Sequence, residues 1–215
     1  MVWLDPDEIS FPDPELYSGE EGVIAVGGDL SPERIWFAYQ NGIFPWFNPG
    51  EEILWWFPDP RFVLFPSHLY VSKSMKKILQ RQEFTFTENQ RFREVMENCR
   101  MANRKGQDGT WISEEMIDSY EILHRAGKAK SVEVWQNEML VGGLYGIEVG
   151  HVFCGESMFA KVSNASKAGF IYFVQKYSTY YSLIDCQSHT SHLESLGAEM
   201  ISAQTFLTII KSAQK

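Results

Sequence analysis

Residues 150 to 187 read GHVFCGESMFAKVSNASKAGFIYFVQKYSTYYSLIDCQ, and this stretch decides the fold class. Its pattern predicts a strand that enters a polar turn at residues 155–158, a helix over residues 165–177, and a second strand over residues 183–186. The helix is apolar nearly all round, which is typical of a helix buried on every side. The stretch therefore predicts two strands joined by a buried helix.

The second strand carries the candidate catalytic groups. Because successive side chains of a strand point to opposite faces, we expect Asp185 and Gln187 on the same face. Ile184 and Cys186 then lie on the other face. A carboxylate and an amide side by side, near the polar turn, can orient a reacting molecule. The structural alternative is that Asp185 caps the helix that follows, and the spacing alone leaves both open.

The segments on either side complete the fold. Amphipathic helices are predicted at residues 72–80, 89–100 and 113–126, and from residue 131 the apolar period changes to two, which predicts strands at 131–135 and 139–149. The glycines of the second strand indicate a bulge or a close backbone approach. Short helices are expected at 192–196 and 205–210. A meander, buried helix, strand and helix in this order predict an α+β fold, with helices packed on a mixed or antiparallel sheet.

The N-terminal region differs in composition from the rest of the chain. A short strand is predicted at residues 23–26 and a helix between Ser31 and Gly42. Large aromatic residues in loops rich in Pro and Gly, around Trp46 and Trp55, either fill a small core or line a pocket. This acidic, aromatic composition gives way to basic helical segments near residues 61–66. We therefore expect a small N-terminal domain over residues 1–62 and a second domain over residues 63–215.

The net charge of −9 is unevenly distributed. Residues 1–60 contain 12 Asp and Glu against one basic residue, Arg34, whereas residues 73–105 contain nine Lys and Arg against four Glu. A basic segment on an acidic protein can still attract a phosphate backbone, because binding depends on the local electrostatic potential and not on the net charge of the whole protein. The alternative is an ordinary pair of solvated helices.

Several classes of protein find no support in the sequence. No apolar run approaches the roughly 18 residues that span a bilayer, and the acidic N-terminus lacks the basic start and apolar centre of a signal peptide. Three cysteines suit a reducing cytoplasm better than a disulfide framework. The glycine motifs of nucleotide hydrolases and dinucleotide redox enzymes are missing. Cys186, His189 and His192, even with Cys154, are spaced too tightly for the usual pairs of zinc ligands.

The strand, turn and buried helix are the layout of acyltransferases that bind coenzyme A. Those enzymes need a glycine-rich turn whose backbone amides bind the pyrophosphate at the helix start. Residues 161–166, KVSNAS, contain no glycine. The scaffold therefore fits an acyltransferase whose usual coenzyme site is altered.

Six motifs, in the same order along almost the whole chain, resemble those of the leucyl/phenylalanyl-tRNA–protein transferases. They are GIFPW at 42–46, WWFPDPR at 55–61, GTW at 109–111, VGGLYG at 141–146, FCGESMF at 153–159 and DCQ at 185–187. No single motif is specific to the family, but the six together are.

The resemblance implies a bacterial cytoplasmic enzyme that moves Leu, Phe or Met from aminoacyl-tRNA onto the α-amine of proteins beginning with Arg or Lys. This marks the acceptor for degradation by the N-end rule pathway. The implied α+β fold has a small N-terminal α/β domain followed by a GNAT-like acyltransferase domain, with a mixed sheet flanked by helices. Such an enzyme needs no coenzyme A, no other cofactor and no metal. We expect a monomer without a membrane partner.

The resemblance also implies roles for individual residues. The catalytic pair falls on Asp185 and Gln187, and the platform for the terminal adenosine of the tRNA falls on Trp46 and Trp111. An apolar side-chain pocket falls on Leu144, Phe153, Met158, Phe173 and Ile184. Glu156 and Ser157 complete the substrate-binding set. Contacts to the tRNA backbone fall on Lys73, Lys76, Lys77 and Arg81.

The chemistry agrees with these roles, because an aminoacyl ester is already activated and needs no ATP site. As a hypothesis, Asp185 holds the incoming amine and orients Gln187, which accepts a hydrogen bond from that amine and relays its proton. Backbone amides near residues 155–158 are the candidate donors to the tetrahedral oxyanion. Two other functions stay open. One is an acyltransferase that uses an acyl-coenzyme A or another carrier, and the other is a non-catalytic RNA-binding module that stacks bases on Trp46 and Trp111.

Overall fold

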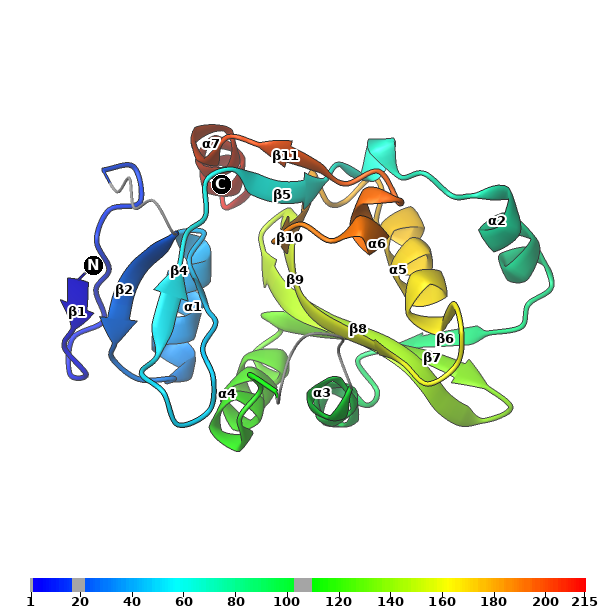
Figure 1. The fold of residues 1–215 in the computed structure, drawn as a ribbon, viewed down its shortest axis with the longest axis horizontal. Coiled ribbons are helices and arrows are strands. Elements are labelled where there is room, and N and C mark those ends of the chain that lie inside the picture. The colour runs from blue at the N-terminus through cyan, green and yellow to red at the C-terminus, as the bar shows by residue number, and fades with distance from the viewer. Residues whose placement is uncertain (1, 17–21, 103–109) are drawn as a thin grey trace.

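A computed structural model describes residues 2–16, 22–102 and 110–215 and contains two sheets (Figure 1). The larger sheet has seven strands in the order β11-β5-β10-β9-β8-β7-β6. Neighbouring strands are antiparallel except β9 and β10, which run parallel. In chain order these strands are β5 (Arg61–Leu64), β6 (Thr85–Glu88), β7 (Ala129–Gln136), β8 (Met139–Val149), β9 (Val152–Ala160), β10 (Leu183–Gln187) and β11 (Glu199–Ile201).

The smaller sheet lies at the N-terminal end of the molecule. Its strands, in spatial order, are β1 (Val2–Leu4), β2 (Val23–Gly27), β4 (Leu54–Trp56) and β3 (Phe44–Pro45). Helix α1 (Pro32–Gln40) connects β2 to β3. It begins as predicted, because the Ser31 side chain accepts a hydrogen bond from the amide of Arg34 and Pro32 occupies the first turn.

Helices cover both faces of the larger sheet (Figure 1). Helix α5 (Ala165–Lys176) packs on one face, and α3 (Phe92–Met101) and α4 (Glu114–Arg125) pack on the other. The remaining helices are the 3-10 helix η1 (Pro66–His68), α2 (Lys73–Gln80), α6 (Ser191–Glu194) and α7 (Ala203–Ala213). No helix in the described part of the chain is long and apolar enough to cross a membrane.

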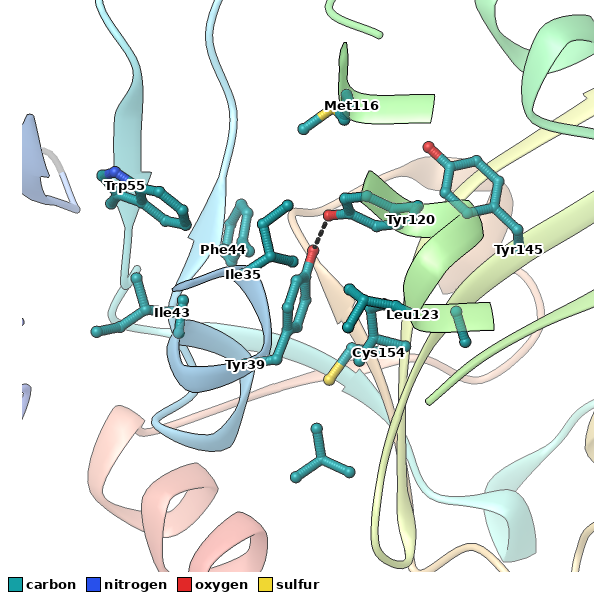
Figure 2. Close-up of a cluster of buried hydrophobic side chains, with 14 of the residues drawn as sticks. Ile35, Tyr39, Ile43, Phe44, Trp55, Met116, Tyr120, Leu123, Tyr145 and Cys154 are labelled. Carbon is teal, nitrogen blue, oxygen red and sulfur yellow. Dashed lines mark hydrogen bonds between the residues drawn. The ribbon is translucent and has the colours of Figure 1, made fainter. Parts of the chain in front are cut away.

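The two sheets share one hydrophobic core. Figure 2 shows Ile35 and Tyr39 of α1 facing Tyr120 of α4 and Cys154 of β9, and all four side chains are at most 1% exposed. A second core lies under α5. The N-terminal sheet is therefore packed into the larger part of the molecule, and the division into domains at residue 62 stays a prediction.

Glycines allow the central strands to approach their neighbours. A Cβ on Gly142 would lie 2.8 Å from the Cβ of Ala165 at the start of α5. A Cβ on Gly146 would lie 2.2 Å from the carbonyl oxygen of Cys154, next to a register shift between β8 and β9. The close approach and the bulge that the sequence predicts in this strand are both confirmed.

The predicted α+β fold with a mixed sheet is confirmed, but the turn predicted at residues 155–158 is wrong. Strand β9 runs through these residues to Ala160, because Ser157 and Met158 pair with Tyr145 and Leu144 of β8. Cross-strand pairing thus outweighs the local preference of a Gly-Glu-Ser sequence for a turn. The short strands β3, β4, β5 and β6 were also not predicted from the sequence.

Candidate active site

A cavity of about 430 Å³ lies where β9 and β10 part. Its walls come from β3, β8, β9, α5, β10 and α6, together with Trp111. The volume falls in the range of small-molecule sites, and the lining combines a mostly apolar surface with a few polar groups. Residues from Phe44 to Leu193 thus come together in one site.

The end of β10 creates the opening. Strand β10 pairs with β9 only over residues 183–185, opposite residues 152–154. The register of β10 against β5 shifts between Asp185 and Gln187, and Gln187 has a φ of 61°. The chain therefore turns out of the sheet at Gln187, and residues 155–158 of β9 line the cavity beyond the last β9–β10 pair.

Asp185 is held in a buried ion pair with Arg61 of β5. The guanidinium donates from Nε to Oδ1 at 2.8 Å and from Nη2 to Oδ2 at 2.7 Å, while the side chains of Arg61 and Asp185 are 1% and 0% exposed. The backbone N–H of Gln187 also donates to Asp185 Oδ1, at 2.9 Å. Asp185 therefore fixes the backbone of Gln187, and it does not cap a helix.

This arrangement corrects one expected role of Asp185. Both carboxylate oxygens already accept hydrogen bonds, and the side chain is inaccessible to an incoming amine. The structure therefore does not place Asp185 to hold the acceptor amine. Its hydrogen bond with the Gln187 backbone N–H is compatible with the other expected role, which is to orient Gln187.

Gln187 and Glu156 meet inside the cavity. The Gln187 amide nitrogen Nε2 donates to Glu156 Oε1 at 2.6 Å. An ionised carboxylate only accepts hydrogen bonds, so the amide must turn its nitrogen toward Glu156. Its carbonyl oxygen Oε1 is then the acceptor that Gln187 presents to the cavity.

Burial gives the Glu156 carboxyl an unusual affinity for protons. Desolvation raises the pKa of Glu156 from 4.5 to about 7, although the Tyr39 hydroxyl, the Gln187 amide and the Tyr120 hydroxyl act in the opposite direction. The carboxyl therefore changes its charge near neutral pH, at a position where it controls the Gln187 amide.

The cysteines of the site are not activated. Cys154 lies opposite Asp185 in β9, and burial raises the pKa of its thiol well above the ordinary value, with a further contribution from the Asp185 charge. Burial also raises the pKa of Cys186. Both thiols are neutral, which disfavours a cysteine nucleophile. No three His, Cys, Asp or Glu side chains of the described residues form a group that could hold a metal ion.

The two tryptophans of the expected adenosine platform, Trp46 and Trp111, are both at the cavity. Trp46 is 43% exposed and Trp111 is 7% exposed, and both line the cavity. The rings of Trp46 and Trp56 lie 5.4 Å apart, and the indole N–H of Trp56 donates to the backbone oxygen of Trp46 at 2.6 Å. Trp56 therefore holds Trp46 at the rim of the cavity.

The apolar part of the cavity contains most of the predicted residues. Leu144, Phe153, Met158 and Ile184 line it, and so do Glu156 and Ser157. Phe173 is the exception, because it is buried behind Phe153, with ring centroids 4.4 Å apart. Phe170, one helical turn earlier in α5, lines the cavity in its place. The helical phase of α5 could not be read from a helix that is apolar nearly all round.

The predicted basic segment is divided into two parts. Lys73, Lys76, Lys77 and Arg81 are all exposed on or directly after α2. In contrast, Arg93 and Arg100 of α3 form ion pairs with acidic residues of α4. Among the described basic residues of this segment, Lys73, Lys76, Lys77 and Arg91 form no ion pair, and Arg81 has only an exposed 3.5 Å pair with Glu83. Arg104 and Lys105 lie outside the described residues.

Three site residues had no predicted role. Arg61 lies at the end of a quoted motif, but only its pairing with Asp185 gives it a function. Tyr39 and Tyr120 sit on helix faces that look apolar in the sequence, and their hydroxyls reach the site through the packing of α1 against α4. No sequence signal distinguishes them from ordinary core tyrosines.

Comparisons with known proteins agree on one family. A family model described as leucyl/phenylalanyl-tRNA protein transferase matches residues 63–211, and a model of the N-terminal domain of the same family matches residues 28–59. A protein of Flavobacterium johnsoniae named leucyl/phenylalanyl-tRNA–protein transferase is 59% identical over 215 residues, covering 99% of this chain and 100% of that protein. A protein of the same name from Christiangramia forsetii is 54% identical, covering 98% of this chain and 100% of that protein.

Among solved structures, similarity is weaker. A GCN5-related N-acetyltransferase from Kribbella flavida has a TM-score of 0.41 and 12% sequence identity, covering 67% of this chain and 55% of that chain.

Proposed function

The chain belongs to the leucyl/phenylalanyl-tRNA–protein transferase family and is an aminoacyltransferase that uses aminoacyl-tRNA and a protein as substrates, and we propose that Gln187 presents the acceptor amine to the aminoacyl ester. In this proposal the donor amino acid is Leu, Phe or Met, and the acceptor begins with Arg or Lys. The modified protein is thereby marked for degradation by the N-end rule pathway. The enzyme acts as a monomer in the cytoplasm.

One observation carries the catalytic part of the proposal. The hydrogen bond from Gln187 Nε2 to Glu156 directs the Gln187 carbonyl oxygen into a cavity that has an aromatic wall and an apolar pocket. That oxygen is suited to accept a hydrogen bond from an amine N–H. An amide is a poor base, so this contact orients the nucleophile and does not remove its proton by itself.

The reaction itself needs alignment more than strong acid–base catalysis. An α-amine has a pKa of about 7.7–8.0, so a useful fraction is neutral near pH 7. The amine nitrogen attacks the ester carbonyl carbon, the new C–N bond forms, and the bond to the ribose oxygen breaks. The ribose hydroxyl leaves with one proton, and the amine loses one. Holding two reactants in line is worth about 7–11 kcal/mol, which makes positioning the main contribution.

The tetrahedral intermediate needs hydrogen-bond donors for its oxyanion. Pairing between β9 and β10 stops at Cys154, so the edge of β9 over residues 155–158 faces the cavity beyond the last β10 partner. Backbone N–H groups on this edge are the proposed donors.

The cavity has parts that fit the two ends of an aminoacyl-adenosine. Trp46 and Trp111 offer faces on which an adenine can stack. The pocket formed by Leu144, Phe153 and Ile184 excludes charged side chains but distinguishes apolar ones weakly, since one methylene is worth only about 1–3 kcal/mol. This agrees with a donor set of Leu, Phe and Met.

The α2 helix is the proposed contact for the tRNA. Lys73, Lys76 and Lys77 are exposed and form no ion pair with any described residue. Lysine side chains bind phosphates irrespective of nucleotide sequence. They would therefore position the acceptor stem of the tRNA, while the cavity recognises the amino acid attached to it.

The test is transfer of labelled Phe from Phe-tRNA to a peptide that begins with Arg. An otherwise identical peptide that begins with Glu, nuclease-treated Phe-tRNA, and labelled acetyl-coenzyme A as the donor serve as controls. We expect transfer only with intact tRNA and the Arg peptide. Transfer from the coenzyme would favour another acyltransferase, and tight Phe-tRNA binding without transfer would indicate an RNA-binding module.

A further inference from the structure

Two buried tyrosines connect helix α1 to the cavity. Tyr39 of α1 and Tyr120 of α4 are 1% and 0% exposed, and their hydroxyl oxygens lie 2.8 Å apart, as Figure 2 shows. The Tyr120 hydroxyl also donates to Glu156 Oε2 at 3.3 Å. The other carboxyl oxygen of Glu156 accepts from Gln187. Four side chains from α1, α4, β9 and β10 thus form one connected chain of hydrogen bonds.

The direction of these hydrogen bonds follows from counting protons. A tyrosine hydroxyl has one proton to donate. Tyr120 gives its proton to the Glu156 carboxylate, so its oxygen must accept the proton of Tyr39. Tyr39 therefore donates to Tyr120, Tyr120 donates to Glu156, and Gln187 donates to Glu156 from the opposite side.

We propose that Tyr39 and Tyr120 are positioning residues that hold the Glu156 carboxyl, and through it the Gln187 amide, in the orientation that transfer requires. The inference rests on the proposed function of Gln187. It makes α1, in the N-terminal part of the chain, a contributor to the reaction although Tyr39 does not line the cavity.

The chain of hydrogen bonds fixes which end of the Gln187 amide faces the cavity. An ionised Glu156 accepts from Nε2 and leaves Oε1 for the acceptor amine. A protonated Glu156 can donate, and a Gln187 amide that flips to accept this proton would present its NH₂ group to the amine, where it cannot accept. The two tyrosine hydroxyls favour the ionised form, because they lower the pKa of Glu156 against the opposing effect of burial.

Other charged or titratable groups surround this carboxyl. The Asp185 carboxylate of β10 raises its pKa, and the Glu156 charge in turn raises the pKa of the Cys154 thiol in the same strand. Tyr145 of β8 packs edge-on against Tyr120, with ring centroids 6.0 Å apart, and Arg61 of β5 balances Asp185. None of these groups replaces the hydroxyl of Tyr120 as a donor to Glu156 Oε2.

The experiment compares Tyr120→Phe and Tyr39→Phe with the intact chain. Each change removes one hydroxyl and keeps the buried ring. The matched control is Tyr177→Phe, because the Tyr177 hydroxyl also donates to a glutamate, Glu88, at 2.5 Å, but outside the cavity. Thermal unfolding of all variants verifies that they are folded.

We expect Tyr120→Phe to lower kcat about 10- to 100-fold with little change in KM for Phe-tRNA, as for a lost hydrogen bond to a charged group. The acidic limb of its pH profile should move to higher pH, because Glu156 loses a group that lowers its pKa. Tyr39→Phe should shift the limb in the same direction, because the Tyr39 hydroxyl also lowers the pKa of Glu156. In a Glu156→Gln background, Tyr120→Phe should produce no further shift, which separates Glu156 from the titration of the substrate amine.

A Tyr120→Phe variant with the kcat and pH profile of Tyr177→Phe would overturn the inference. The titration of the Glu156 carboxyl can also be followed by NMR with ¹³C-labelled glutamate, which requires no transfer. A pKa of Glu156 that rises in Tyr120→Phe supports the positioning role even where the intact protein fails to transfer Phe. An unchanged pKa overturns it, and failure of transfer by the intact protein counts against the proposed function alone.

Discussion

Replacing Arg61 by methionine should destabilise the protein strongly, because it leaves Asp185 buried without its cation. Arg61→Met removes both Arg61 hydrogen bonds to the carboxylate and leaves it only uncharged donors, the Gln187 backbone N–H and the Cys154 thiol. The Arg61 guanidinium also lies over the rings of Phe44 and Phe206, at 4.8 and 4.4 Å from their centroids. A methionine fills much of this space but supplies no charge.

The size of the effect follows from the burial of the pair. Both side chains are at most 1% exposed, and removing one partner of such a pair costs about 3–5 kcal/mol. With a urea dependence of about 2 kcal/mol per molar, this corresponds to a midpoint lower by roughly 2 M. A double variant, Arg61→Met with Asp185→Leu, removes both charges and should recover at least about 2 kcal/mol relative to Arg61→Met, since an apolar pair of similar volume can replace a buried ion pair.

Urea unfolding and transfer of Phe, measured on the same preparations, separate the two roles of the pair. The double variant should be folded yet remain slow in transfer, because the backbone N–H of Gln187 has lost the Asp185 carboxylate as its hydrogen-bond acceptor. Arg100→Met, which breaks only an exposed pair with Glu114, should change stability little. An Arg61→Met variant with the midpoint of the intact protein, or a double variant less stable than Arg61→Met, would refute the reasoning.

Three further outcomes follow from the site. Charge reversal of Lys73, Lys76 and Lys77 should weaken Phe-tRNA binding and reduce the slope of log Kd against log salt concentration by up to about 0.9 per lost phosphate contact. The control Arg100→Glu should change neither the affinity nor the slope. Binding titrations at several salt concentrations measure both quantities. Trp46→Ala should weaken binding of Phe-adenosine by about 1–3 kcal/mol in calorimetry, and an unchanged affinity would exclude stacking on this ring. Glu156→Gln should stabilise the protein above pH 7. The pKa of the Glu156 carboxyl is about 7 in the folded protein and 4.5 in the unfolded chain, so the intact protein loses stability as the pH rises from 4.5 to 7. Denaturant unfolding of both proteins should therefore show free energies of unfolding that diverge as the pH rises through this range.

The sequence predicted the fold class because its decisive segments have strong, long patterns. The period-two run of β7 and β8 and the apolar helix α5 appear where they were expected. The short strands were missed for physical reasons. Strand β5 has four residues that are all buried, so it shows no alternation, and β3 and β4 have only two and three residues among prolines and aromatics.

The site was predictable in its identities but not in its contacts. Asp185 and Gln187 both line the cavity, but not through simple strand alternation, because the register shifts between them and Gln187 has a φ of 61°, so that Ile184 and Cys186 line it too. Trp46 and Trp111 also line the cavity. The burial of Asp185 could not be anticipated, because its partner Arg61 is 124 residues away in sequence. The same holds for Tyr39 and Tyr120, whose hydroxyls meet across 81 residues. Pairings of this kind are set by tertiary packing, which leaves no local pattern.

The most direct test of the account is the single-turnover rate of Phe transfer from Phe-tRNA to a peptide that begins with Arg, measured for the intact protein and for Gln187→Ala, with Phe-tRNA binding followed in parallel. In the proposed mechanism the Gln187 carbonyl, oriented by the hydrogen bond to Glu156, receives the acceptor amine, so loss of this side chain should lower the rate constant at least about 100-fold and leave the Kd for Phe-tRNA unchanged. An unchanged rate constant in Gln187→Ala, or no transfer by the intact protein, would contradict the account.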